Sequence, residues 1–99
     1  MPFNNMTEIK RANKAAGDHW FDPSTMRFFL SRIESETVKD GRYFVTSEKC
    51  PFGPGHVRAF TVREAHDNGT IGTVGEFQGH KSTREAWAWL KAEQRRGAI

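Results

Sequence analysis

The chain has 99 residues, the size of a single domain built on one hydrophobic core. Its 15 basic and 12 acidic residues give a net charge of only +3, spread along the chain, which argues against both disorder and a dedicated nucleic-acid-binding stripe. Eight phenylalanines and three tryptophans predict a folded domain with an aromatic core. There is no apolar run long enough to cross a membrane and no secretory leader, so we expect one cytoplasmic domain over residues 1–99.

The first predicted element is a short helix from Thr7 to Ala16. Thr7 is a suitable N-cap, Ile9 lies on the apolar side, and Gly17 suits the position just after the last turn. So narrow an apolar stripe would not hold an isolated helix, so we expect it to dock on the rest of the domain. The opposite side of this helix carries three cations, Lys10, Arg11 and Lys14.

Aromatic residues are concentrated between residues 19 and 29. Asp22-Pro23 predicts a tight turn or a single-turn helix, and residues 26–38 favour a strand. Two interpretations remain open for the aromatic residues. They cover the second face of the sheet, which we favour because a small domain needs its aromatic side chains, or they form a partner-binding patch with neighbouring arginines. The residues concerned are Trp20, Phe21, Phe28 and Phe29.

Three further strands are predicted from turn signals and alternation. Asp40-Gly41 and Asn68-Gly69 are typical of two-residue hairpin turns, because both turn positions need positive φ. Strands are expected over residues 42–47, 57–65 and 71–77, with a Pro/Gly loop over 48–55. In the third strand Phe60 and Val62 share one face, and Thr61 and Arg63 share the other. Two hairpins joined by a loop predict a four-stranded antiparallel meander.

The last predicted element is a helix that begins after Ser82. Ser82 and Glu85 have the spacing of a capping box, in which each side chain accepts from a backbone amide at the start of the helix. Ala86 and Leu90 lie on its apolar side, and Gly97 ends it. The predicted fold class is therefore α+β: a four-stranded antiparallel meander sheet with an N-terminal helix and a C-terminal helix packed on it, in the order α-β-β-β-β-α.

The residue patterns that could carry chemistry match no catalytic or metal-binding template. Cys50 and His56 lie close in the Pro/Gly loop, but no orienting partner or oxyanion site accompanies them. The glycines at 69, 72, 75 and 79 do not have phosphate-loop spacing and fit a turn and strand packing better. Glu34 and Glu36 fit an exposed strand face. We therefore expect no enzymatic activity, no cofactor and no metal.

Three segments resemble a family of small uncharacterised proteins carried by bacteriophages, plasmids and integrative elements. They are residues 13–33, 43–48 and 73–77, and the most specific run is Phe21-Asp22-Pro23-Ser24-Thr25-Met26-Arg27-Phe28-Phe29. The similarity covers about residues 8–93. It implies no catalytic residues. It does imply a mobile genetic element as the setting, where small proteins often block host machinery by occupying a surface.

The leading functional hypothesis is a non-enzymatic binding protein that modulates or inhibits a host defence complex, for example an anti-CRISPR. Its partner would be a host protein or a protein–nucleic-acid complex, and the protein itself a monomer or a homodimer. The alternative is direct nucleic-acid binding through basic and aromatic surface residues. The expected partner-binding residues are Lys10, Arg11, Lys14, Trp20, Arg27 and Arg32.

Overall fold

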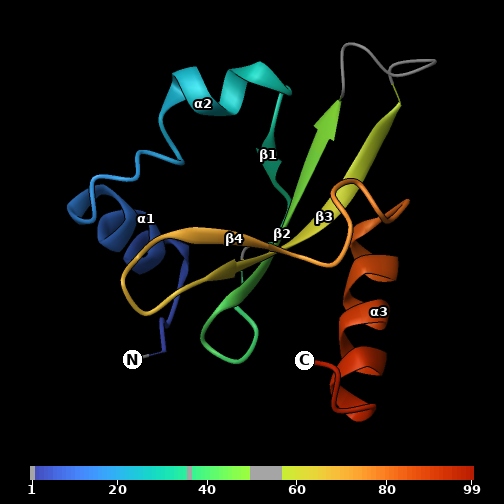
Figure 1. The fold of residues 1–99 in the computed structure, drawn as a ribbon. Helices are drawn as coiled ribbons and strands as arrows, with labels where there is room; N and C mark the ends of the chain where they lie inside the picture. Colours follow the sequence, from blue (N-terminus) through green and yellow to red (C-terminus); the bar gives the residue numbers. More distant parts are fainter. Residues whose placement is uncertain (1, 36, 50–56) are drawn as a thin grey trace.

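The computed structural model describes residues 2–35, 37–49 and 57–99. It confirms the α+β prediction: one four-stranded antiparallel sheet in the order β1-β2-β3-β4 lies between an N-terminal and a C-terminal helix (Figure 1). The elements in chain order are α1 (Met6–Ala15), α2 (Pro23–Phe28), β1 (Arg32–Ile33), β2 (Tyr43–Lys49), β3 (Arg58–Ala65), β4 (Ile71–Val74) and α3 (Thr83–Arg95).

The two central strands, β2 and β3, carry most of the sheet. They pair along their whole length, from Tyr43 opposite Glu64 to Lys49 opposite Arg58. The predicted meander is therefore confirmed. The strand continues further than predicted, because Glu48 and Lys49 were expected in the loop and instead extend β2. The rest of that predicted loop, residues 50–55, lies outside the described residues.

Both predicted hairpins form, but only Asp40-Gly41 makes the predicted two-residue turn; in the second hairpin the Gly69 amide donates to the His66 carbonyl, and Asn68 does not have a positive φ. Asp40 and Gly41 have φ of 55° and 73°, the positive values that a type I′ turn requires at its two central positions. Gly69 has a φ of 92° in the turn before β4. A side chain at Gly69 would also collide with the Ala12 carbonyl of α1, so this glycine lets the hairpin approach the first helix.

The prediction of a strand over residues 26–38 is wrong for most of its length. Residues 23–28 form α2, and only Arg32–Ile33 pair as β1. Proline at the first position after Asp22 starts the helix, and the Asp22 carbonyl accepts from the Thr25 and Met26 amides. The strand preference of the phenylalanines is thus overridden by the local helix start, and the element order becomes α-α-β-β-β-β-α.

Three local predictions are corrected by hydrogen bonds and strand bounds. Asn5, and not Thr7, caps α1, by accepting from the Glu8 amide. Ser82 caps α3 as predicted, but Glu85 accepts from the Lys81 amide, one residue earlier than a capping box would have it. β4 ends at residue 74, so the residues predicted to continue it, Gly75 and Phe77, follow the strand.

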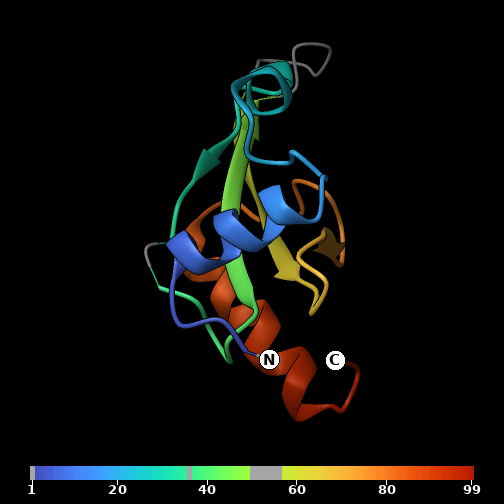
Figure 2. The ribbon, with the colours of Figure 1, turned by 90° about the vertical axis from the view of Figure 1, so that its left-hand side faces the viewer.

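The sheet lies between α1 on one side and α3 on the other (Figures 1 and 2), and each face is covered by its own apolar cluster. α3 covers one face, with Val45, Val62 and Leu90 fully buried there. The preferred interpretation of the aromatic segment is confirmed for Trp20 and Phe21, which pack with α1 on the other face around the buried Phe44 ring. Phe28 and Phe29 lie outside both clusters, on and just after α2.

Candidate functional site

Four cations from four different segments line one groove beside α2. Arg27 comes from α2, Arg32 from β1, Lys49 from the end of β2 and Arg58 from the start of β3. The groove, called here the cationic groove, has a volume of about 350 Å³, and its other lining residues are Pro23, Met26, Leu30 and Ser31. Sheet register explains the convergence, because Lys49 and Arg58 are direct cross-strand partners.

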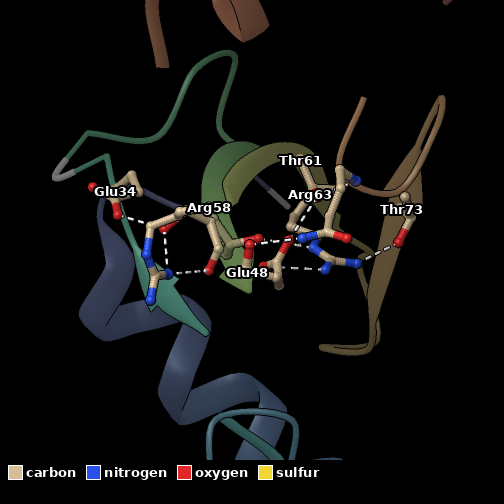
Figure 3. Close-up of polar contacts among 9 residues, drawn as sticks. Glu34, Glu48, Arg58, Thr61, Arg63 and Thr73 are labelled. Carbon is tan, nitrogen blue, oxygen red and sulfur yellow. Dashed lines mark hydrogen bonds and ion pairs between the residues drawn. The ribbon is translucent and has the colours of Figure 1, made fainter. Parts of the chain in front are cut away.

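The Arg58 side chain is held in place by the sheet. Its Nη1 donates to the Ser47 carbonyl at 3.0 Å and to the Ser47 hydroxyl oxygen at 2.8 Å. The same hydroxyl donates to Glu34 (Figure 3). Within the described residues no carboxylate lies within ion-pair distance of the four cations, so their charges remain available to an anionic partner.

A second groove, called here the aromatic groove, lies on the other side of α2. It has a volume of about 450 Å³ and shares Met26 and Ser31 with the cationic groove. Phe28 and Phe77 are large apolar side chains that remain 64% and 42% exposed there. Its full lining is Trp20, Ser24, Thr25, Met26, Phe28, Phe29, Ser31, Arg63 and Phe77.

The charged group in the lining of the aromatic groove is the guanidinium of Arg63, part of a buried network on this face of the sheet. Its Nε donates to Thr46, its Nη1 to Thr73, and its Nη2 lies 3.4 Å from Oε2 of the fully buried Glu48 (Figure 3). Glu48 in turn accepts from the Thr61 hydroxyl through Oε1. The network therefore fixes both charges deep in a small domain.

Burial and the neighbouring carboxylate have opposite effects on Arg63. Burial lowers the pKa of its guanidinium below the usual value, and the charge and hydrogen bonding of Glu48 partly offset that effect. The Trp20 and Phe77 rings lie 5.3 and 5.5 Å from the Arg63 Cζ, near enough for cation–π attraction on both. The positive charge of Arg63 is thus compensated by Glu48, and its side chain is held in place as a hydrogen-bond donor close to two aromatic rings.

Leu30 has an unusual backbone for an exposed aliphatic residue. It follows α2 with a φ of 51°, in the left-handed region that costs an ordinary L-residue roughly 1–2 kcal/mol. Its side chain is 54% exposed and lines the cationic groove, so little burial within this chain offsets that cost. The Leu30 and Ser31 amides donate to the Arg27 and Met26 carbonyls, so this left-handed residue ends α2 in the manner of a Schellman motif.

The structure separates the expected partner-binding residues into two groups. Arg27 and Arg32 meet in the cationic groove, and Trp20 lies in the aromatic groove next to it. The α1 cations Lys10, Arg11 and Lys14 are exposed on a helix that lies lower against the sheet (Figure 1). They line neither groove.

Sequence reasoning missed two of the groove cations and the buried pair. A signal for Lys49 and Arg58 was present, because residues at equal distances from the two ends of a hairpin loop face each other across the strands. No comparable signal existed for Glu48 with Arg63. They belong to different strands and meet only through their side chains.

The residues considered for catalysis do not assemble within the described part of the chain. Cys50 and His56 lie outside it, as does Glu36. His19 pairs with the exposed Asp22 at 3.2 Å, and Glu34 accepts from the Ser47 hydroxyl. Across residues 2–35, 37–49 and 57–99, no group of three or more His, Cys, Asp or Glu side chains is placed to hold a metal ion. No helix in these same ranges is both long and apolar enough to span a bilayer.

Comparison with known proteins gives one match. Neither a curated protein nor a solved structure matches the chain. A family model described as a family of unknown function (DUF7447) matches residues 5–91, which include every described helix and strand except the last turn of α3. The chain therefore belongs to this family of unknown function, DUF7447.

Proposed function

We propose that this chain is a non-enzymatic binding protein that docks an acidic partner protein on the α2 surface, defined as α2 with the cationic and aromatic grooves on its two sides. The observation that carries the proposal is the convergence of Arg27, Arg32, Lys49 and Arg58 around one groove. These side chains come from four segments, so the fold, and not a run of basic sequence, builds the positive surface.

Exposed apolar side chains favour a protein over a nucleic acid as the partner. Arginines beside a central aromatic and aliphatic patch are the composition of protein interface cores. Phe28 could stack on a base, but the exposed aliphatic side chain of Leu30 offers a base no ring to stack on and a phosphate no donor. An aliphatic contact at the edge of the cationic groove is explained by a partner that offers both carboxylates and apolar side chains.

The biological setting of the proposal is a mobile genetic element. The resemblance of residues 21–29 to phage and plasmid proteins covers all of α2, the helix that separates the two grooves. Small proteins from such elements often act by occupying a host surface. We therefore propose a component of a host defence complex, such as a CRISPR effector, as the acidic partner, with inhibition as the consequence of docking.

An affinity pull-down from native host lysate tests the proposal. Wild-type protein is compared with Arg27→Glu/Arg32→Glu, which reverses two cations of the groove, and with Lys10→Glu/Lys14→Glu on α1 as a matched charge control. The bound proteins are identified and each affinity is then measured with purified partner. The groove variant should lose at least tenfold in affinity, about 1.4 kcal/mol, while the α1 variant keeps its affinity.

Two outcomes contradict the proposal. Equal binding by the groove variant would mean that the α2 surface is not the interface. Capture of nucleic acid alone, abolished by nuclease and falling steeply with added salt, would favour the alternative of direct nucleic-acid binding. The fold of each variant is checked by far-UV circular dichroism, since all four substituted side chains are exposed.

A further inference from the structure

The aromatic groove has the walls of a site for one large apolar group. Four aromatic rings and Met26 line it, and its volume of about 450 Å³ falls in the range of sites that enclose small ligands. Phe29 contacts both Phe28 and Phe77, with ring centroids 4.6 and 5.3 Å apart. The rings therefore support one another and leave apolar surface facing the groove, although no group of the described chain fills it.

Arg63 adds a hydrogen-bond donor to this apolar site. A guanidinium has five N–H groups, and the Thr46, Thr73 and Glu48 contacts account for three of them. Because Glu48 already compensates the charge, a second carboxylate would gain little, and an uncharged acceptor such as a carbonyl oxygen suits the site better. The occupant is thus an apolar group with a carbonyl beside it, which describes a residue of a polypeptide.

The aromatic groove lies next to the cationic groove, and this position indicates the charge of the polypeptide that binds. The two grooves share Met26 and Ser31, so a chain segment leaving the aromatic groove reaches Arg27 and Arg32 directly. Carboxylates on that segment would complement these cations, which have no carboxylate within ion-pair distance among the described residues. Charge complementarity therefore favours an acidic segment with one apolar residue.

We infer that the aromatic groove receives one large apolar side chain from an acidic segment of the partner, and that Arg63 donates a hydrogen bond to a backbone carbonyl beside that side chain. The inference rests on the proposed function and adds the chemistry of the segment recognised. The segment is extended where it binds, because a carbonyl inside a helix is already hydrogen-bonded.

Synthetic peptides test the inference without the natural partner. The probes are acetylated, amidated pentapeptides: Asp-Asp-Phe-Asp-Asp, the same peptide with a central Ala, and Lys-Lys-Phe-Lys-Lys. Binding is followed by ¹⁵N–¹H NMR at three groups of the aromatic groove, the Trp20 indole N–H, the Arg63 Nε–H and the Ser31 amide. The acidic Phe peptide should give saturable shifts at all three, the Ala peptide should bind at least fivefold more weakly, and the basic peptide should give none.

One variant and its control test whether the Phe ring of the peptide binds in the aromatic groove. Phe77→Ala removes one wall and lies outside the described helices and strands, so the fold should survive. It should weaken the acidic Phe peptide to the level of the Ala peptide. Val57→Ala is the matched control, because Val57 is 72% exposed and lines a different hollow near Arg58. It should leave the affinity unchanged.

The results separate this inference from the proposed function. Equal binding of the Phe and Ala peptides, or shifts that avoid all three reporter groups, overturns the anchor while leaving the docking role of Arg27 and Arg32 intact. Loss of the pull-down dependence on those arginines overturns both. Stronger shifts at the same groups with uridine monophosphate or an oligo-dT strand than with the acidic Phe peptide overturn the inference in favour of a nucleobase site.

Discussion

Replacing Arg63 by methionine should cost about 3–5 kcal/mol of unfolding free energy. The Glu48 side chain is fully buried and loses the positive charge 3.4 Å away, which leaves a carboxylate whose one hydrogen bond among the described residues comes from Thr61. Thr46 and Thr73 also lose the donor that they accept from. A domain of this size has roughly 5–15 kcal/mol in total, so Arg63→Met should be marginal.

The complementary change should cost less. Glu48→Met leaves the Arg63 guanidinium unpaired, but that group lines the aromatic groove and lies between two rings, so water and cation–π contacts still stabilise it. The double variant Glu48→Met/Arg63→Met removes both charges and keeps similar volumes. It should lose far less than the sum of the two single changes, with a coupling energy of at least about 2 kcal/mol.

Urea unfolding followed by far-UV circular dichroism measures the cycle. Trp20 fluorescence is unsuitable, because that ring contacts Arg63. Thr73→Val, which removes a single hydrogen-bond acceptor, calibrates the scale at about 1 kcal/mol. If Arg63→Met does not fold but the double variant does, that result also shows that Glu48 and Arg63 form a coupled pair. Additive losses, or a cost below about 1 kcal/mol for Arg63→Met, would refute the argument that the pair is a coupled buried unit.

Three further changes test other parts of the structure. Leu30→Asn should raise the unfolding free energy by about 0.5–1 kcal/mol, because asparagine tolerates the left-handed backbone, and should weaken partner binding, measured by urea unfolding and by the pull-down affinity. Burial, and then the Glu64 carboxylate, raise the pKa of Tyr43 above its ordinary value of 10.0. The stability that the protonated tyrosine contributes is therefore present below pH 10 and is lost as the pH rises further. In urea unfolding at different pH values, Tyr43→Phe should gain stability relative to wild type above pH 10. Gly75→Ala and Gly17→Ala both place alanine at positive φ, near 78° and 75°, but only at Gly75 would the new Cβ lie 2.5 Å from the Trp89 ring, so Gly75→Ala should lower the melting temperature more.

The parts of the fold that were predicted correctly depend on local signals. Asp40-Gly41 and Gly69 specify the two hairpins through residues that tolerate positive φ, although Asn68 does not take the turn position predicted for it, and alternation then assigns the faces of β3. Ser82 and the apolar residues that follow it specify α3 in the same local way. Each of these signals acts over a few residues, so no knowledge of the rest of the molecule was needed.

The largest error, the strand predicted over residues 26–38, arises where two local signals compete. The aromatic side chains of Phe28 and Phe29 favour a strand, but Asp22-Pro23 starts a helix at residue 23, and the helix continues to Phe28. The extent of a short helix depends on what it packs against and on where it can stop. Here the helix stops because Leu30 adopts a left-handed backbone, a conformation that a leucine in the sequence does not predict.

That competition also explains why only part of the candidate site could be predicted. In a strand, Phe28 and Phe29 would point to opposite faces of the sheet, and Arg27 would share a face with Phe29. In α2, Met26 lies between the two grooves, and Arg27 and Phe28 line different grooves. Residue type alone was enough to propose Arg27 and Arg32 as partner-binding residues. Their position beside Lys49 and Arg58 requires α2 to fold back against the ends of β2 and β3. The Lys49 amide, which donates to the Phe29 carbonyl at 2.7 Å, links the two segments there. The proposed binding surface therefore depends on a helix where the side-chain propensities had predicted a strand.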